Sequence, residues 1–275
     1  MEKRDKTYTG AFARIYDDIM KNVPYDLWYK YLRELLGYFN KSPERIIDLA
    51  CGTGNMTLRF ARDFPLIIGV DRSSSMLHRA VEKAGDRENI QFLEADLVNM
   101  DLDSRFDFAF SVFDSLNYIL SLEKLERVFV NVHQLLKPDG LFIFDMNTSK
   151  RLMSIEPGTT MFSGDNYSCL WEDIIDEKNV RWKVKLKIYL DDSDVDIFEE
   201  FHQETAYPVV DIKNSLFSAG FKYVDVFKAY TFDRGGENDN RLYYVATKQK
   251  GIGMTPSFLK KYGKKIKWKL LSRSY

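Results

Sequence analysis

The stretch Arg45-Ile46-Ile47-Asp48-Leu49-Ala50-Cys51-Gly52-Thr53-Gly54-Asn55-Met56-Thr57 decides the fold of this 275-residue chain. Its pattern predicts a buried strand, a glycine turn and the beginning of a helix. The two glycines permit positive φ angles at no steric cost, and they let main-chain N–H groups approach a ligand closely. The stretch therefore indicates an α/β fold with a nucleotide-like ligand at the turn.

The acid at the end of the predicted strand narrows the class of ligand. A dinucleotide fingerprint has a third glycine, so that a pyrophosphate can lie against the helix N-terminus. Here Thr57 takes that place, and Asp48 would repel a pyrophosphate. We expect instead a ligand that carries a cationic group and a ribose.

Two further predicted strands also end in acids. Residues 66–70 are followed by Asp71, which comes after Gly54 at close to the ~20-residue spacing of a carboxylate that holds ribose hydroxyls. Residues 90–96 end in Asp96, followed by Leu97. A carboxylate beside a backbone N–H supplies the acceptor and the donor that an adenine edge requires. The three strand ends match one ligand, read from amino acid to ribose to base.

These motifs, with the run from Phe106 to Phe144, resemble the class I S-adenosylmethionine-dependent methyltransferases over residues 8–247. The resemblance implies S-adenosylmethionine as cofactor, S-adenosylhomocysteine as product, and a doubly wound, seven-stranded, mostly parallel sheet. It also implies an N-terminal lid, in which Tyr8 and Tyr16 lie over the methionine end; core packing is their alternative role. Similar enzymes bind the cofactor's ammonium through backbone carbonyls near Ser111 and Phe113. The residues expected to contact the cofactor are Tyr8, Tyr16, Asp48, Ala50, Gly52, Thr53, Gly54, Asn55, Asp71, Arg72, Met76, Asp96, Leu97, Ser111 and Phe113.

The methyl acceptor is expected beyond the fourth strand, residues 107–113, because ligands of open α/β sheets lie outside the carboxyl ends of the strands. The fifth strand, residues 141–144, ends at the same edge. The residues expected to contact the acceptor are Asp114, Asn117, Tyr118, Asp145 and His202. No catalytic residue is assigned; the candidates are His202, Asp145 and Tyr118. The alternatives are that Asp114 and Asp145 cap turns and that His202 is a hydrogen-bonded strand residue.

Between residues 150 and 207 the periodicity changes from helical to two. Residues 179–190 alternate basic with apolar side chains, which predicts a strand with one wet and one dry face. Residues 167–175 and 196–207 are its expected partners in an antiparallel lid over the active-site mouth. We therefore expect lid helices and a cofactor-binding half in residues 1–149, a β-rich substrate lid in 150–207, the rest of the core in 208–247, and a tail in 248–275.

The tail differs from the body in charge. Residues 248–275 contain nine Lys or Arg and no acids, so the remaining chain is strongly acidic. A terminal amphipathic helix is the simplest interpretation, with RNA or membrane-surface contact as alternatives. No apolar run approaches the ~20 residues of a membrane span, and we expect a cytoplasmic protein that is a monomer or homodimer.

The sequence predicts methyl transfer to a nitrogen or oxygen of a small molecule, without a metal site. Three alternatives stay open at this point. In the first, the acceptor is an RNA or a protein that binds the basic tail. In the second, the cofactor is a nicotinamide. In the third, the chain binds the cofactor without catalysing a reaction.

Overall fold

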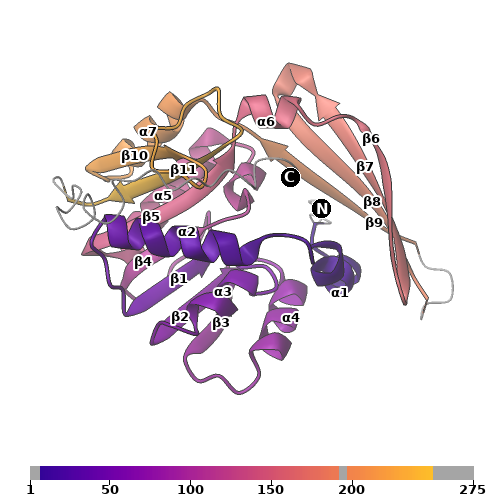
Figure 1. The fold of residues 1–275 in the computed structure, drawn as a ribbon, viewed down its shortest axis with the longest axis horizontal. Helices are drawn as coiled ribbons and strands as arrows, with labels where there is room; N and C mark the ends of the chain where they lie inside the picture. The colour runs from indigo at the N-terminus through magenta and orange to yellow at the C-terminus, as the bar shows by residue number, and fades with distance from the viewer. Residues whose placement is uncertain (1–6, 192–196, 250–275) are drawn as a thin grey trace.

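The structure is a computed structural model that describes residues 7–191 and 197–249. Its frame consists of two β-sheets, one of seven strands and one of four (Figure 1). The strands of the large sheet are β1 (Arg45–Leu49), β2 (Leu66–Asp71), β3 (Ile90–Glu94), β4 (Phe106–Ser111), β5 (Leu136–Asn147), β10 (Tyr223–Lys228) and β11 (Arg241–Thr247).

The large sheet has the order β10-β11-β5-β4-β1-β2-β3. Neighbours from β5 to β3 run parallel, and β11 runs antiparallel to both β5 and β10. The predicted seven-stranded, mostly parallel sheet is therefore confirmed. Its central strands are buried on both faces, which explains why β1 reads as a continuous apolar run rather than an alternating one.

Helices cover both faces of the large sheet. One apolar cluster joins it to α2 (Tyr25–Tyr38) and α3 (Asn55–Phe60). The other cluster joins it to α5 (Leu122–Leu135) and α7 (Val209–Ser218). The helix α4 (Ser74–Ala84) packs beside β3, and its N-cap is Ser73, whose Oγ accepts a hydrogen bond from Met76 N.

The second sheet, which we call the lid sheet, contains β6 (Gly158–Gly164), β7 (Tyr167–Asp176), β8 (Arg181–Leu190) and β9 (Ile197–Thr205). Its dry face buries alternate residues of β8, namely Val184, Leu186, Ile188 and Leu190. The helix α1 (Gly10–Ile19) packs between this face and α4 (Figure 1). The remaining helical elements are short: η1 (Ser115–Tyr118), α6 (Ser149–Met153) and η2 (Glu177–Asn179).

Two expectations about strands were wrong. The lid sheet has a fourth strand, β6, whose sequence GTTMFSG lacks the alternation that marks a half-buried strand. The fifth strand is longer than the expected residues 141–144, because it begins at Leu136, before Pro138, and ends at Asn147. A register shift against β4, between Phe106 and Phe108, lets β5 pass through this proline. The predicted tail helix lies almost wholly in residues 250–275, outside the described residues.

Candidate active site

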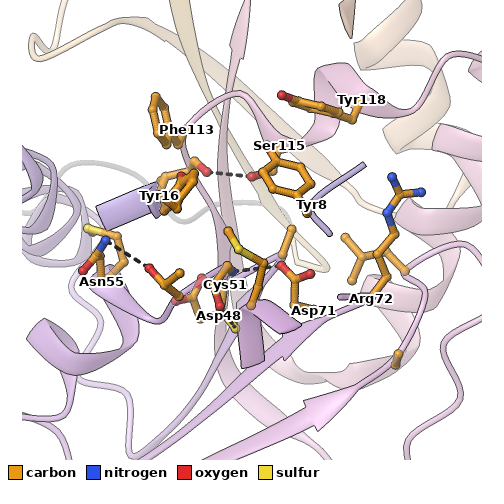
Figure 2. Close-up of a pocket in the computed structure, with 18 of the residues that line it drawn as sticks. Tyr8, Tyr16, Asp48, Cys51, Asn55, Asp71, Arg72, Phe113, Ser115 and Tyr118 are labelled. Atoms are coloured by element: carbon orange, nitrogen blue, oxygen red, sulfur yellow. Dashed lines mark hydrogen bonds between the residues drawn. The ribbon is translucent and has the colours of Figure 1, made fainter. Parts of the chain in front are cut away.

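A cavity of about 1030 Å³, counting its open mouth, lies at the carboxyl ends of β1, β2 and β4 (Figure 2). This is the edge at which open parallel sheets bind ligands. The cavity is lined by Tyr8, Tyr16, Tyr25, Trp28, Asp48, Ala50, Cys51, Gly52, Thr53, Asn55, Met56, Asp71, Arg72, Met76, Ala95, Asp96, Leu97, Val112, Phe113, Ser115, Tyr118 and Ile119.

The turn after β1 depends on backbone angles that favour glycine. Gly52 has a φ of 56° and Gly54 a φ of 78°. A Cβ on Gly54 would also lie 3.1 Å from the Cβ of Ala80 and from the ring of Phe92. Gly54 therefore lets the turn pack against α4 and β3, whereas Gly52 faces the cavity.

The carboxylate of Asp71 fixes the shape of this turn. Its Oδ2 accepts a hydrogen bond from Gly52 N at 2.8 Å, and its Oδ1 accepts one from Ser73 N at 2.9 Å. Burial raises the pKa of Asp71, although both backbone donors oppose that effect. Asp96, one strand further, is exposed and accepts a hydrogen bond from Val98 N at 2.9 Å. Both acids line the cavity.

Asp48 is a buried carboxyl group without a cationic partner among the described residues. It is 2 % exposed, and the hydroxyl of Thr57 donates a hydrogen bond to its Oδ2 at 2.6 Å. Burial raises the pKa of Asp48 to about 8, and the charge of Asp71 adds to the effect. Because Asp48 lines the cavity, a cationic ligand would stabilise its ionised form.

Aromatic side chains form the opposite wall of the cavity, which we call the roof. It consists of Tyr8, Tyr16, Tyr25, Trp28 and Phe113. The Tyr25 hydroxyl and the Trp28 Nε1 are buried and have no hydrogen-bond partner in the described residues. A buried donor without an acceptor is costly. Two such donors, opposite an acid that favours a cation, fit the carboxylate and ammonium of the methionine part of S-adenosylmethionine.

A network of polar side chains, which we call the latch, fastens α1 to the glycine turn. Asp17 on α1 accepts hydrogen bonds from Thr53 Oγ1 at 2.7 Å, Asn55 Nδ2 at 2.9 Å and Lys83 Nζ at 2.6 Å. Burial alone would raise the pKa of Asp17, but these donors outweigh it and lower the pKa. The latch holds Tyr16, one residue earlier, in the roof.

His202 lies behind the roof rather than in it. Its Nδ1 is 3.4 Å from the hydroxyl of Tyr118, which does line the cavity, and its Nε2 is 3.2 Å from Glu200 Oε2. His202 and Glu200 are both on β9, and His202 is 5 % exposed. The same Glu200 carboxylate accepts hydrogen bonds from Tyr8 N at 2.8 Å and Thr9 N at 2.9 Å. The lid sheet and the N-terminal segment are thus joined at this carboxylate.

The other expected acceptor-binding residues lie together in a buried polar cluster beside the cavity. Asp145 is fully buried, accepts a hydrogen bond from Asp114 N at 2.9 Å, and pairs with Arg241 at 2.6 Å. Burial raises the pKa of Asp145, and the guanidinium of Arg241 counteracts this. Asn117 donates to the carbonyls of Asn147 and Thr205, and so connects η1 with β5 and β9. These contacts orient the loop after β4.

The structure therefore brings together most, but not all, of the residues expected at the site. Fourteen expected residues line the cavity: Tyr8, Tyr16, Asp48, Ala50, Gly52, Thr53, Asn55, Asp71, Arg72, Met76, Asp96, Leu97, Phe113 and Tyr118. Six others do not line it: Gly54, Ser111, Asp114, Asn117, Asp145 and His202. Ser111 is buried within β4, and its hydroxyl has no hydrogen-bond partner in the part of the chain described.

Sequence reasoning missed eight residues that line the cavity: Tyr25, Trp28, Cys51, Met56, Ala95, Val112, Ser115 and Ile119. Most of them adjoin a residue that was expected. Tyr25 and Trp28 do not, because α2 reads simply as an amphipathic helix. The signal that could have distinguished them is their polar atoms, since a buried Trp or Tyr usually needs a hydrogen-bond partner.

Neither a cluster of metal ligands nor a membrane-spanning helix occurs in residues 7–191 and 197–249. No group of three or more His, Cys, Asp or Glu side chains there is arranged to hold a metal ion. In the same residues, no helix combines the length and the apolar character that a membrane span requires.

Comparison with known proteins identifies the family. Residues 46–140 match the sequence profile of a family described as "Methyltransferase domain". A Bacillus subtilis protein named "Putative methyltransferase YqeM" is 32% identical over 251 residues, which are 89% of this chain and 98% of that protein. The crystal structure of an S-adenosylmethionine-dependent methyltransferase from Clostridium acetobutylicum superposes with a TM-score of 0.74 at 28% identity, covering 86% of this chain and 97% of that chain.

A more distant neighbour agrees in fold. The sugar N-methyltransferase KedS8 from Streptoalloteichus has a TM-score of 0.69 at 18% identity, covering 90% of this chain and 98% of that chain. The full-length relative, the structural neighbours and the cavity at the strand ends agree with one another. This chain belongs to the class I S-adenosylmethionine-dependent methyltransferases and is an enzyme of that family.

Proposed function

We propose that the enzyme transfers the methyl group to a nitrogen or oxygen of a small molecule. The observation that carries this proposal is the partial cover over the cavity: Tyr16 of α1 lines it, and the lid sheet packs on α1. We further propose that residues 150–207 act as the substrate lid. A small acceptor can be held under such a cover, whereas a folded macromolecule needs an open face. The similarity in fold to a sugar N-methyltransferase supports the same class of acceptor.

The cofactor is proposed to lie along the strand ends. Asp71 would accept the ribose hydroxyls, because it is a buried carboxylate at the end of β2. Asp96 and Leu97 would border the adenine. Asp48 would face the ammonium, and the donors of Tyr25 and Trp28 would hold the carboxylate. Met76, which is 1 % exposed, would pack against the cofactor from α4.

The chemistry requires mainly orientation. The bound sulfonium supplies an activated methyl group. The chain must therefore hold the acceptor in line at about 3 Å and exclude water, which is the role proposed for the roof and the lid sheet. An acceptor that arrives protonated also needs a group that removes the proton. Tyr118 is the expected catalytic candidate that lines the cavity, and Asp145 is held away from it.

The direct test is a transfer assay with radiolabelled S-adenosylmethionine. The acceptors would be a panel of aliphatic amines, amino sugars, hydroxy acids and phenols, with bulk tRNA and a peptide mixture as macromolecular controls. We expect label to enter a small molecule only, and the Asp71→Ala variant to be much slower. Label in RNA or peptide, lost after removal of residues 248–275, would contradict the proposal. Cofactor binding without transfer to any acceptor would favour a non-catalytic module.

A further inference from the structure

The contacts behind the roof form an ordered chain of hydrogen bonds that leads out of the cavity. Tyr118 stands on the cavity wall opposite Asp48 and Asp71 (Figure 2). His202 follows it at 3.4 Å and Glu200 follows His202 at 3.2 Å. Glu200 is fully buried and His202 nearly so, so water does not interrupt the chain.

The hydrogen-bond partners of Glu200 determine which nitrogen of His202 carries a proton and which group donates to the other nitrogen. Both carboxylate oxygens already receive main-chain N–H groups, from Tyr8 and Thr9, and the Thr9 hydroxyl donates to the same group. An ionised carboxylate can only accept hydrogen bonds. The Nε2 of His202 must therefore carry a proton and donate it to Glu200. The neutral ring then leaves Nδ1 as an acceptor, and Tyr118 is the donor that reaches it.

We infer that Tyr118 is the group that removes the proton of the methyl acceptor, with His202 and Glu200 as positioning residues that make it basic. The inference rests on the proposed function, because it needs an acceptor in the cavity. With its own proton directed at His202, the phenol oxygen accepts a hydrogen bond from the hydroxyl of Tyr8 with one lone pair and keeps the other for the methyl acceptor. Burial holds the pKa of Tyr118 well above its usual value, helped by the nearby charge of Glu204. A free tyrosinate is therefore disfavoured, and the phenol must pass its proton on.

The proton balance is closed within these three residues. From a hydroxyl, the proton moves to the Tyr118 oxygen as the carbon–oxygen bond forms and the methyl–sulfur bond breaks. From an ammonium group, the proton moves to the Tyr118 oxygen first, and the freed nitrogen lone pair then forms the carbon–nitrogen bond as the methyl–sulfur bond breaks. The Tyr118 proton moves to His202 Nδ1, and the resulting imidazolium faces the carboxylate of Glu200. The proton leaves to solvent when the product does. The relay specifies the acceptor: its reacting atom bears a proton, as in a hydroxyl or an ammonium group.

The surroundings of His202 contain few competing groups among the described residues. The ring of Tyr8 lies 4.7 Å from that of His202, and the ring of Phe12 lies 5.2 Å away. Cys169 on β7 has a raised pKa, because of burial and then the charge of Glu200, so it stays a thiol. The carboxyl group of Glu204 acts on Tyr118 and Tyr8, and burial raises its own pKa well above the usual value.

Nitrogen NMR of the ¹⁵N-histidine-labelled protein with S-adenosylhomocysteine tests the relay without a known acceptor. The chain has three histidines, so His202→Gln assigns the signals directly. We expect His202 in the Nε2–H form, and a shift of its Nδ1 signal in Tyr118→Phe. Tyr25→Phe is the matched control, because it removes a roof phenol outside the relay and should leave both signals unchanged. A proton on Nδ1 of His202 in the wild type would overturn the inference.

A second readout separates this inference from the proposed function. Tyr118→Phe should bind S-adenosylhomocysteine within about twofold of wild type, yet transfer methyl to a hydroxyl or ammonium acceptor of the panel about 10²-fold to 10⁴-fold more slowly. Glu200→Gln should lower kcat and leave the KM for S-adenosylmethionine nearly unchanged. Intact transfer in Tyr118→Phe would refute the relay and leave the methyltransferase proposal standing. A wild-type protein that does not bind S-adenosylhomocysteine would count against the proposed function itself.

Discussion

The two walls of the cavity are built in different ways. The wall at the strand ends, which contains Asp48, Gly52 and Asp71, is held by hydrogen bonds from main-chain N–H groups of the adjoining turns to the Asp71 carboxylate. The opposite wall, which contains the roof and Tyr118, is assembled from segments far apart in the chain: Tyr8 is joined to Glu200, and Tyr118 to His202. The first wall is local and its chemistry concerns the cofactor. The second depends on tertiary packing, and we assign it the acceptor.

This difference can be tested from both sides, beginning with Asp71. Asp71→Ala removes charged hydrogen bonds to the ribose and releases Gly52 N. We expect S-adenosylhomocysteine binding to weaken by about 1–3 kcal/mol, measured by calorimetry. Asp96→Ala, at an exposed carboxylate, serves as the control and should cost less. Equal losses in the two variants would contradict the assignment of the ribose to Asp71.

Asp48→Asn should separate binding from stability. The pKa of Asp48 is about 8 in the fold, far above the usual value near 3.9 in an unfolded chain, so the folded state holds this proton more tightly. Its stabilising effect is complete below the unfolded pKa and is lost as pH rises through 8. We therefore expect Asp48→Asn to stabilise the ligand-free protein by about 1–3 kcal/mol at pH 9 relative to its effect at pH 4, and to weaken S-adenosylhomocysteine binding.

Urea unfolding of wild type and variant at the two pH values measures this effect. The Thr57 hydroxyl can donate to the asparagine oxygen as it does to Asp48, so packing is retained. A stability difference that does not depend on pH would show that the carboxyl group is not titrating as described.

Removing the hydrogen-bond donors of the roof should weaken S-adenosylhomocysteine binding less, and should not lower the unfolding free energy. Trp28→Phe and Tyr25→Phe each remove a buried donor that lacks a partner. We expect S-adenosylhomocysteine binding to fall by about 1 kcal/mol in each case, with unfolding free energy unchanged or slightly raised. Thermal unfolding with and without the ligand measures both quantities. Variants that lose stability yet bind normally would place these donors in the core rather than the site.

The latch should give the smallest effect. Lys83→Met breaks the ion pair with Asp17, both partners of which are about one-third exposed. Such a pair is worth about 0.5 kcal/mol. We expect faster release of S-adenosylhomocysteine, because α1 opens more readily, with high salt producing a similar change in the wild type. Release rates measured by stopped flow test this, and an unchanged rate would show that α1 does not control access.

The same contrast explains what the sequence could predict. The succession of strands and helices, the acids Asp48 and Asp71 and the glycine turn follow from local patterns, because strand, turn and helix succeed one another along the chain. Glu200 and Trp28 carry no local signal. Their roles arise only when β9 meets the N-terminal segment and α2 crosses the large sheet. The strand β6 was missed for a related reason, since nearly all of its side chains are exposed and impose no alternation.

The site candidates divide along the same line. His202 lies close to the cavity, and its place behind Tyr118 depends on the register of β9 against β8, where His202 pairs with Val184. A shift by one residue would turn its side chain to the outer face. Asp145 shares a strand end with the site, yet Arg241 from β11 holds its carboxylate in the buried cluster. Neither the position of His202 nor that of Asp145 can be predicted from residues nearby in the sequence.

The most direct measurement is calorimetric titration of the ligand-free enzyme with S-adenosylhomocysteine, with NAD as control, in two buffers of different ionisation enthalpy at pH 7. We expect tight binding of S-adenosylhomocysteine alone, with release of a proton as the ligand ammonium ionises Asp48. Asp48→Asn should abolish the proton release. Binding of NAD instead, or binding of S-adenosylhomocysteine without any difference between the buffers, would contradict the assignment of this cavity wall to the cofactor.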